Sequence, residues 1–282
     1  MNHIQRFRTT ACAVLTCLAV HAKAESPVSL SLGVVPQFTA TETLMRWAPM
    51  IERLKTSCGH TVQLRPSNSI PAFEAQFLEG KFDLAFMNPY HAVMAKRAQG
   101  YLPLVRDNKR RLKGVLVVRA DSPYRTPKDL DGQTIAFPAP NAFGASLLMR
   151  AVLERDQGVR ITPAYVKTHS NAYRHVLAGQ AAAAGGVQAT LQSESDDIKS
   201  QLRVLFETPA SAPHPLSAHP RVDAATRACI EKTMLEASNS AEGQAALASI
   251  QINEPVTAVY ASDYAPLERL ALEAYVVQSP AK

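Results

Sequence analysis

The sequence predicts an α/β protein of two lobes, each a mostly parallel sheet flanked by helices, with a ligand cleft between the lobes. Segments of alternating or β-branched apolar residues, typical of strands, alternate along the chain with segments whose apolar residues recur at helical spacing. This order is typical of sheets covered by helices. This alternation runs from residue 28 to about residue 105, and it starts again near residue 113. Nothing repeats at a period of 20–50 residues, which excludes a solenoid.

The first run follows the pattern β-α-β-α-β-α-β. Residues 28–35 alternate and are β-branched, which predicts a strand. Residues 41–55 carry apolar side chains at helical spacing, which predicts a helix. The other expected elements are a strand at 61–64, a helix at 70–78, a strand at 82–87, a helix to about 98 and a strand at 102–105.

The second run is expected to form a lobe inserted in the first, because the C-terminal segment has no lobe of its own. Its expected strands are 113–119, 134–137, 161–166, 181–187 and 202–206, its helices 143–155 and 171–178, with a helical turn at 126–130. Beyond them, the Pro- and His-rich residues 208–220 predict a loop, and the rest is mainly helical. We therefore expect lobe 1 at 25–110 and 206–282, and lobe 2 at 111–205, joined by two crossing strands.

The first 24 residues resemble a secretory signal peptide. Arg6 and Arg8 are followed by the apolar run 10–20 and by Ala22-Lys23-Ala24, the small-x-small form of a cleavage site. The apolar run is too short to span a bilayer, which needs about 20 residues. We expect a cleaved signal and a periplasmic protein. A lipoprotein anchored through Cys17 is the alternative, and Thr16 disfavours it.

The two cysteines beyond this segment, Cys58 and Cys229, are expected to form a disulfide. An isolated pair in an oxidising compartment is a disulfide candidate, and it would close a loop of about 170 residues. No His or Cys at metal-ligand spacing accompanies either cysteine, so we expect no metal site and no cofactor.

The charge distribution argues against nucleic acid as a partner. The net charge of +6 includes three basic residues of the signal segment, and the other Lys and Arg residues are dispersed. The exception is Lys109-Arg110-Arg111 with Lys113. This cluster has no interleaved aromatic residues, so we expect a solvated turn there.

Ligands of open α/β sheets bind at the carboxyl ends of strands, where helix N-termini present free N–H groups. Here these places are residues 36–38, 88–91, 138–146 and 168–171, and Gln188 at the end of a small strand. The chain has no GxSxG, HExxH, P-loop or GxGxxG motif, so we expect no enzymatic activity. Amides, hydroxyls and aromatic rings dominate these places, and such groups hold ligands but transfer protons poorly.

The segments LGVVPQF, FEAQFLEGKFDLAFMNPYHAVMA, KGVLVVRADS, DLDGQTIAFPAPNAFGAS, THSNAYRHVLAGQAAAAGGV and APHPLSAHPRV occur in this order. Together they resemble the phosphate/phosphite/phosphonate-type substrate-binding proteins of ABC importers, a family with the type II periplasmic binding protein fold. The resemblance covers nearly all of the chain after the signal segment. It implies capture of a small oxyanion by a monomer for a membrane ABC permease. The alternative is a sensory receptor for such an anion that signals to a membrane histidine kinase.

The family's binding site carries over only in part. Its Ser-Thr-Ser run is replaced after Pro140-Asn141 by residues 142–146 (AFGAS), so the hydroxyls of the run are missing, while backbone N–H groups remain for an anion. The family's histidine is matched by His169. Its acidic residue is replaced by Gln188, whose amide both donates and accepts, which favours a ligand without positive charge.

The residues expected to bind the ligand lie in the five places named above. Several have a structural alternative: turn formation for Asn88, packing at a lobe edge for Tyr90, a helix surface for His91, and helix capping for Asn141 and His169. The full set is Gln37, Phe38, Asn88, Tyr90, His91, Asn141, Ala142, Phe143, Gly144, His169, Ser170, Asn171 and Gln188.

Overall fold

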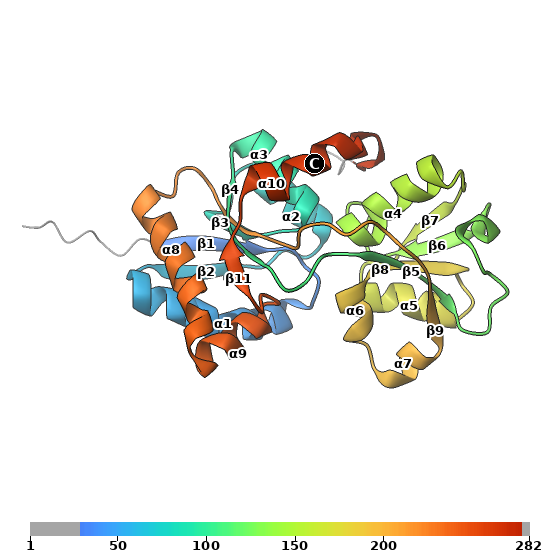
Figure 1. Cartoon of the computed structure of the whole chain (residues 1–282), viewed down its shortest axis with the longest axis horizontal. Coiled ribbons are helices and arrows are strands. Elements are labelled where there is room, and N and C mark those ends of the chain that lie inside the picture. The colour runs from blue at the N-terminus through green and yellow to red at the C-terminus, as the bar shows by residue number, and fades with distance from the viewer. Residues whose placement is uncertain (1–28, 278–282) are drawn as a thin grey trace, which may run out of the picture.

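The computed structural model describes residues 29–277. They form two α/β lobes side by side, each with its own sheet and surrounding helices (Figure 1), which confirms the predicted fold class. The expected signal peptide lies outside the described residues. Within them, no helix is both long enough and apolar enough to cross a membrane.

Lobe 1 is built on a six-stranded sheet with the order β11-β4-β10-β3-β1-β2. Its strands are β1 (Ser29–Val34), β2 (Thr61–Arg65), β3 (Leu84–Phe86), β4 (Leu102–Asp107), β10 (Leu216–Ala218) and β11 (Pro255–Thr257). Its helices are α1 (Ala40–Cys58), α2 (Ile70–Leu78), α3 (Pro89–Gln99), α8 (Ala224–Glu236), η4 (Ala237–Asn239), α9 (Ala241–Ser249) and α10 (Tyr260–Asp263).

Lobe 2 is built on a five-stranded sheet with the order β7-β6-β8-β5-β9. Its strands are β5 (Gly114–Arg119), β6 (Thr134–Phe137), β7 (Thr162–Tyr165), β8 (Ala183–Val187) and β9 (Leu202–Glu207). Its helical segments are η1 (Pro127–Leu130), η2 (Phe143–Leu147), α4 (Leu148–Ala151), η3 (Val152–Asp156), α5 (His169–Leu177), α6 (Gln188–Gln192) and α7 (Asp196–Ser200).

Local signals explain where the helices begin and end. The Thr39 side chain accepts the N–H of Glu42 and caps α1, which ends at Gly59 with φ 69°. Asn88 caps α3 in the same way by accepting the N–H of His91. Proline follows at the first helical position, where its missing N–H costs nothing.

The sheets are mixed, whereas the sequence predicted mostly parallel pairing. In lobe 1, β10 runs antiparallel to both β3 and β4, and β11 runs antiparallel to β4. In lobe 2, β5 runs antiparallel to both β8 and β9. The strands β5, β9 and β10 adjoin the segments by which the chain passes between the lobes. β5 and β10 enter their sheets directly from the other lobe, without an intervening helix, so their direction is not constrained to be parallel.

Residues 208–220, expected to be a loop, contain the buried strand β10. Its three residues are too few for a periodic pattern, and they are held because strands pair with them on both sides. The sheet strands of lobe 1 come from residues 29–107 and 216–257, and those of lobe 2 from 114–207. The exact lobe boundaries stay a prediction.

Two segments connect the sheets, and they pair where they pass each other. The N–H of Leu112 donates to the carbonyl of Ser211 at 3.0 Å, and the N–H of Ser211 donates back at 2.9 Å. The residues after α10, η5 (Ala265–Leu270) and η6 (Leu272–Tyr275), form a C-terminal strap that runs from lobe 1 towards α4 of lobe 2 (Figure 1). Three stretches of chain therefore link the lobes.

One hydrophobic cluster spans both lobes. It joins Phe73 and Tyr90 of lobe 1 to Phe143 and Leu148 of lobe 2, and to Leu272 of the strap. All five side chains are buried. The lobes are thus packed against each other on the strap side as well as connected by chain.

The predicted disulfide is confirmed. Cys58 at the end of α1 and Cys229 in α8 are bonded, with their Cα atoms 5.9 Å apart. The bond links the two parts of the chain that make up lobe 1.

Candidate functional site

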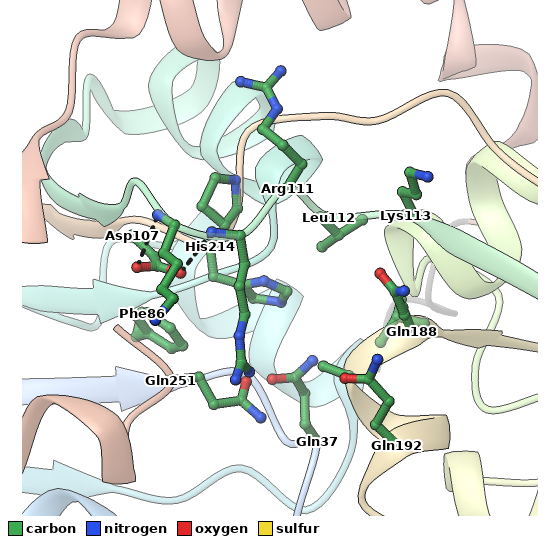
Figure 2. A pocket seen from close by; sticks show the side chains of 15 residues that line it. Gln37, Phe86, Asp107, Arg111, Leu112, Lys113, Gln188, Gln192, His214 and Gln251 are labelled. Atoms are coloured by element: carbon green, nitrogen blue, oxygen red, sulfur yellow. Dashed lines mark hydrogen bonds between the residues drawn. The ribbon is translucent and has the colours of Figure 1, made fainter. Parts of the chain in front are cut away.

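A cavity of about 350 Å³ lies between the lobes (Figure 2). We call it the outer chamber. Its lining comes from lobe 1, lobe 2 and both connecting segments, so it is a shared cleft. The lining residues are Gln37, Phe86, Asp107, Lys109, Arg110, Arg111, Leu112, Lys113, Val187, Gln188, Ala189, Gln192, Pro213, His214 and Gln251.

Four glutamine amides face this chamber from opposite sides. Figure 2 shows Gln37 and Gln251 of lobe 1 across from Gln188 and Gln192 of lobe 2. Gln37 follows β1, whereas Gln188 and Gln192 are the first and last residues of α6. Each amide both donates and accepts hydrogen bonds, so the four suit a polar uncharged or anionic group.

The basic cluster lines this chamber, and Lys109, Arg110 and Arg111 are exposed, so the expected solvated turn lies at the cleft. The carboxylate of Asp107, a residue that is 1% exposed, fixes the backbone of this turn by hydrogen bonds. Its Oδ1 accepts the N–H groups of Glu254 at 2.8 Å and Asn253 at 3.0 Å. The N–H groups of Lys109 at 3.3 Å and Arg110 at 3.1 Å also donate to this carboxylate. The cationic side chains therefore stand on a fixed backbone beside the cleft.

A smaller space of about 20 Å³, the inner chamber, adjoins the outer one. The two share Gln37, Leu112, Val187 and His214, so they are continuous. The inner lining is completed by Val35, Ile70, Asn88, Ala142, Phe143, Gly144, Ala145 and His169.

Two histidines at the inner chamber are neutral at neutral pH. Burial lowers the pKa of His169 to about 4. The pKa of His214 falls to about 3, chiefly because of burial and further because of its electrostatic interaction with the neighbouring imidazoles of His91 and His169. The Nδ1 atom of His169 has no hydrogen-bond partner among the described residues, and the side chain is 7% exposed. A buried unpaired ring nitrogen of this kind is available to a ligand.

The helical run 143–156 begins at the inner chamber. Ser146 and Leu147 donate their N–H groups to the carbonyl of Ala142, so the N–H groups of residues 143–145 precede the first helical bonds. The start of this run packs closely on β5, since a Cβ added to Gly114 would lie 2.0 Å from the carbonyl oxygen of Gly144. The expected anion-binding N–H groups are thus placed beside the connecting segment.

Asn141 and His91 form a buried inter-lobe contact instead of facing either chamber. The Asn141 amide donates to Glu74 Oε2 at 2.9 Å and to the carbonyl of Val277 at 2.9 Å, and its oxygen accepts the Val277 N–H at 3.0 Å. His91 Nε2 lies 2.8 Å from Glu74 Oε1. Glu74 belongs to lobe 1, Asn141 to lobe 2 and Val277 to the strap, so this group joins all three.

Tyr90 is 1% exposed and lines neither chamber. Its ring stacks on that of Phe143 with the centroids 6.3 Å apart. Burial, together with the neighbouring Glu273 carboxylate, raises the Tyr90 pKa to about 12. Asn88 both caps α3 and lines the inner chamber.

Three other expected residues lie outside both chambers. Phe38 lies under the Arg46 guanidinium, 4.1 Å from it. Ser170 hydrogen-bonds to Glu194, and the Asn171 amide donates to the carbonyl of Val166 at 2.9 Å. The structure therefore gathers a smaller set of the expected residues at the cleft: Gln37, Asn88, Ala142, Phe143, Gly144 and His169 at the inner chamber and Gln188 at the outer one.

The model of the family described as ABC transporter, phosphonate, periplasmic substrate-binding protein matches residues 32–264. The chain belongs to this family. It is accordingly a periplasmic substrate-binding protein of an ABC transporter, and its membrane partner is the permease.

Solved structures share its fold. The binding protein of an ABC phosphonate transporter from Pseudomonas aeruginosa is 14% identical, with 87% of this chain and 86% of that chain covered and a TM-score of 0.75. PhnD1 from Prochlorococcus marinus, solved with methylphosphonate, is 15% identical, with 88% and 99% covered and a TM-score of 0.77. A Xanthomonas citri protein bound to chloride is 15% identical, with 88% and 95% covered and a TM-score of 0.70.

Sequence reasoning missed several residues of this substrate-binding protein's cleft. His214 lies in the Pro- and His-rich segment that looked like an ordinary loop, and its ring stacks on Phe86 with the centroids 5.6 Å apart. Gln251 follows α9 and Gln192 ends α6, positions without any motif. Only the basic cluster carried a visible signal, namely its departure from the dispersed charge elsewhere in the chain.

Proposed function

We propose that this protein captures a small phosphonate-type oxyanion between its lobes and delivers it to an ABC permease. The observation that carries the proposal is the charge of the cleft, which is lined by four cations and one carboxylate. Because that carboxylate already accepts four backbone N–H groups, it offers little to a cationic ligand. A cavity with this lining attracts anions.

The proposed seat of the oxyanion is the mouth of the inner chamber, where it opens into the outer one, because about 20 Å³ by itself holds little more than a water molecule. It offers the unpaired Nδ1 of His169 and the helix start at residues 143–145, whereas the Asn88 amide is already hydrogen-bonded to His91 and to the carbonyl of Asn141. A neutral histidine donates one hydrogen bond to an anion without the cost of charging. The methylphosphonate bound by PhnD1 supports this ligand class.

Transport is favoured over the sensory role because the matching family is described as the substrate-binding component of an ABC transporter. Binding without catalysis is favoured because the cleft presents amides, cations and neutral imidazoles.

Export by cleavage after Ala24 is part of the proposal. The mass of the protein recovered from the periplasm tests it, since the cleaved chain begins at Glu25.

A thermal-shift screen of phosphate, phosphite, sulfate, arsenate and alkylphosphonates tests the ligand class. A true ligand at a hundredfold excess over its Kd adds about 2.7 kcal/mol of stability. Calorimetry should then show that His169→Ala weakens binding more than tenfold, or about 1.4 kcal/mol. His175→Ala is the matched control, because His175 belongs to the same helix and lines neither chamber. Equal affinities in the two variants would contradict the proposed site.

Tyr90 is among the ligand-binding residues expected from the sequence, and Tyr90→Ala would be the direct test of that role. It is a less specific test, since Tyr90 is 1% exposed and packs on Phe143. Loss of a buried aromatic side chain costs about 3–5 kcal/mol of stability by itself. Tyr90→Phe keeps the ring packing and is the better variant.

A further inference from the structure

We infer that the natural ligand carries a second negative charge, bound in the outer chamber by Lys109 and Arg110. The inference rests on the proposed function, which seats an oxyanion at the mouth of the inner chamber. It adds the substrate class: an oxyanion whose organic tail ends in another acid, such as a carboxylate.

The first support is that these two cations have no acidic partner. Among the ion pairs of the described residues, Lys113 is held by Glu207 at 2.9 Å, whereas Lys109, Arg110 and Arg111 are in none. Figure 2 shows the Arg111 side chain directed away from Gln37 and Gln188. Lys109 and Arg110 therefore remain as the uncompensated cations for a bound group.

The second support is that Asp107, the one carboxylate among the described residues of the lining, is already engaged in hydrogen bonds. Asp107 is 1% exposed, and its oxygens accept the N–H groups of Lys109, Arg110, Asn253 and Glu254. It serves to hold the turn and is not directed at a ligand. A ligand ammonium group would thus meet two cations and no free carboxylate, so a positively charged tail is disfavoured.

The third support is the shape of the cleft. The outer chamber holds about 350 Å³, a volume typical of small-molecule sites, and a simple oxyanion at the mouth of the inner chamber would fill only a small part of it. The chambers meet at Leu112 and Val187, whose apolar side chains suit a short carbon chain. Beyond them, the amides of Gln188 and Gln192 face Gln37 and Gln251 and would hydrogen-bond the tail.

Matched ligands of equal length test the inference by calorimetry on the protein purified from the periplasm. The acidic series is phosphonoacetate, 3-phosphonopropionate and 4-phosphonobutyrate. The neutral series is ethyl-, propyl- and butylphosphonate, and the cationic probe is 2-aminoethylphosphonate. We expect at least one acid to bind tenfold tighter than its neutral match, and the cationic probe to bind more weakly than ethylphosphonate. The tenfold preference should shrink as NaCl is raised, because the Debye length falls from about 10 Å at 0.1 M to about 3 Å at 1 M.

The double variant Lys109→Gln/Arg110→Gln should reduce the acid preference to below threefold. Arg160→Gln is the control for losing a positive charge outside the cleft: its side chain is 92% exposed and it lines neither chamber, so the preference should persist. Acids no tighter than their neutral matches, or a preference that survives the double variant, would overturn the inference while leaving the proposed function standing. Failure of every phosphonate to bind would overturn the proposed function and this inference together.

Discussion

At the residue scale, two residues that line the cleft have unfavourable local features, a buried unpaired imidazole and a left-handed backbone conformation. His169 is buried with an unpaired Nδ1, and its pKa is lowered to about 4 by burial. Gln251 has φ 65°, the left-handed region that glycine normally occupies. Both features cost stability, and both occur at residues that line the cleft.

The His169 pKa predicts a pH dependence of stability. In the unfolded chain its pKa is about 6.5, so between pH 6.5 and 4 the unfolded state binds more protons. The free energy of unfolding therefore falls as the pH falls through this window. From pH 7 to pH 5 the contribution of His169 is about 2 kcal/mol. Urea denaturation of His169→Gln should show a loss smaller by that amount, with His175→Gln as the control for removing an imidazole from the same helix. An unchanged loss would contradict the buried neutral state.

Replacing Gln251 by glycine should affect the stability of the protein and its affinity for the ligand in opposite directions. The N–H groups of Gln251 and Ile252 donate to the carbonyls of Ala248 and Leu247, so Gln251 ends α9 where glycine is the usual residue. Gln251→Gly should raise the free energy of unfolding by about 0.5–1 kcal/mol in denaturant melts, and calorimetry should show weaker ligand binding because an amide is lost.

Lys167→Gly is the matched control for this variant. Lys167 has φ 77° and lines neither chamber, so its replacement should stabilise the protein without changing affinity. Weaker binding in the control as well would show that backbone flexibility, and not the Gln251 amide, is responsible.

At the element scale, the loop before η2 is held from three sides. Asn141 bonds to Glu74 of α2 and to the backbone of Val277. Arg150 of α4 is 7% exposed and donates to the carbonyls of Pro140 at 2.9 Å and Tyr275 at 2.7 Å. The strap and α2 thereby position the helix start that faces the inner chamber.

Asn141→Ala should lower the free energy of unfolding by about 3 kcal/mol. The substitution leaves the buried Glu74 Oε2 without its Asn141 partner, and an unpaired buried group costs about 1–3 kcal/mol, or more when it is charged. The part-buried bonds to the Val277 backbone are lost as well. Asn108→Ala is the control, since that exposed amide donates to the Glu254 carboxylate at 3.1 Å and should change stability by less than about 0.5 kcal/mol. Similar denaturation midpoints for the two variants would refute the structural role of this contact.

At the scale of the whole molecule, lobe 1 is assembled from both ends of the chain. The Cys58–Cys229 bond closes a separation of 171 residues around all of lobe 2. Such a bond stabilises mainly by restricting the unfolded chain. It holds α1 against α8 whether or not the lobes move.

Replacing both cysteines by serine should cost about 4 kcal/mol of stability, within the usual range for removal of a native disulfide. Thermal melts with and without dithiothreitol check this. Reductant should lower the Tm of the wild type to that of the variant and leave the variant unaffected. A wild-type Tm that does not respond to reductant, despite full reduction shown by thiol labelling, would contradict it.

The sequence by itself determined the local elements. The predicted strand 134–137 and helix 70–78 coincide with β6 and α2, because periodicity and caps are encoded within the segment. The two-lobed class and the disulfide were also predictable, since each follows from the order of elements or from the cysteine count.

Only the tertiary structure decided which residues meet at the cleft. β10 is a strand because β3 and β4 pair with it from distant parts of the chain. Asn141 lines neither chamber because it hydrogen-bonds to Glu74 and Val277, which lie 67 and 136 residues away in sequence. The cations at 109 and 110 line a cavity because Asp107 holds their turn against residues 253 and 254. These outcomes depend on long-range partners, and no local pattern records which distant group satisfies a hydrogen bond or a charge.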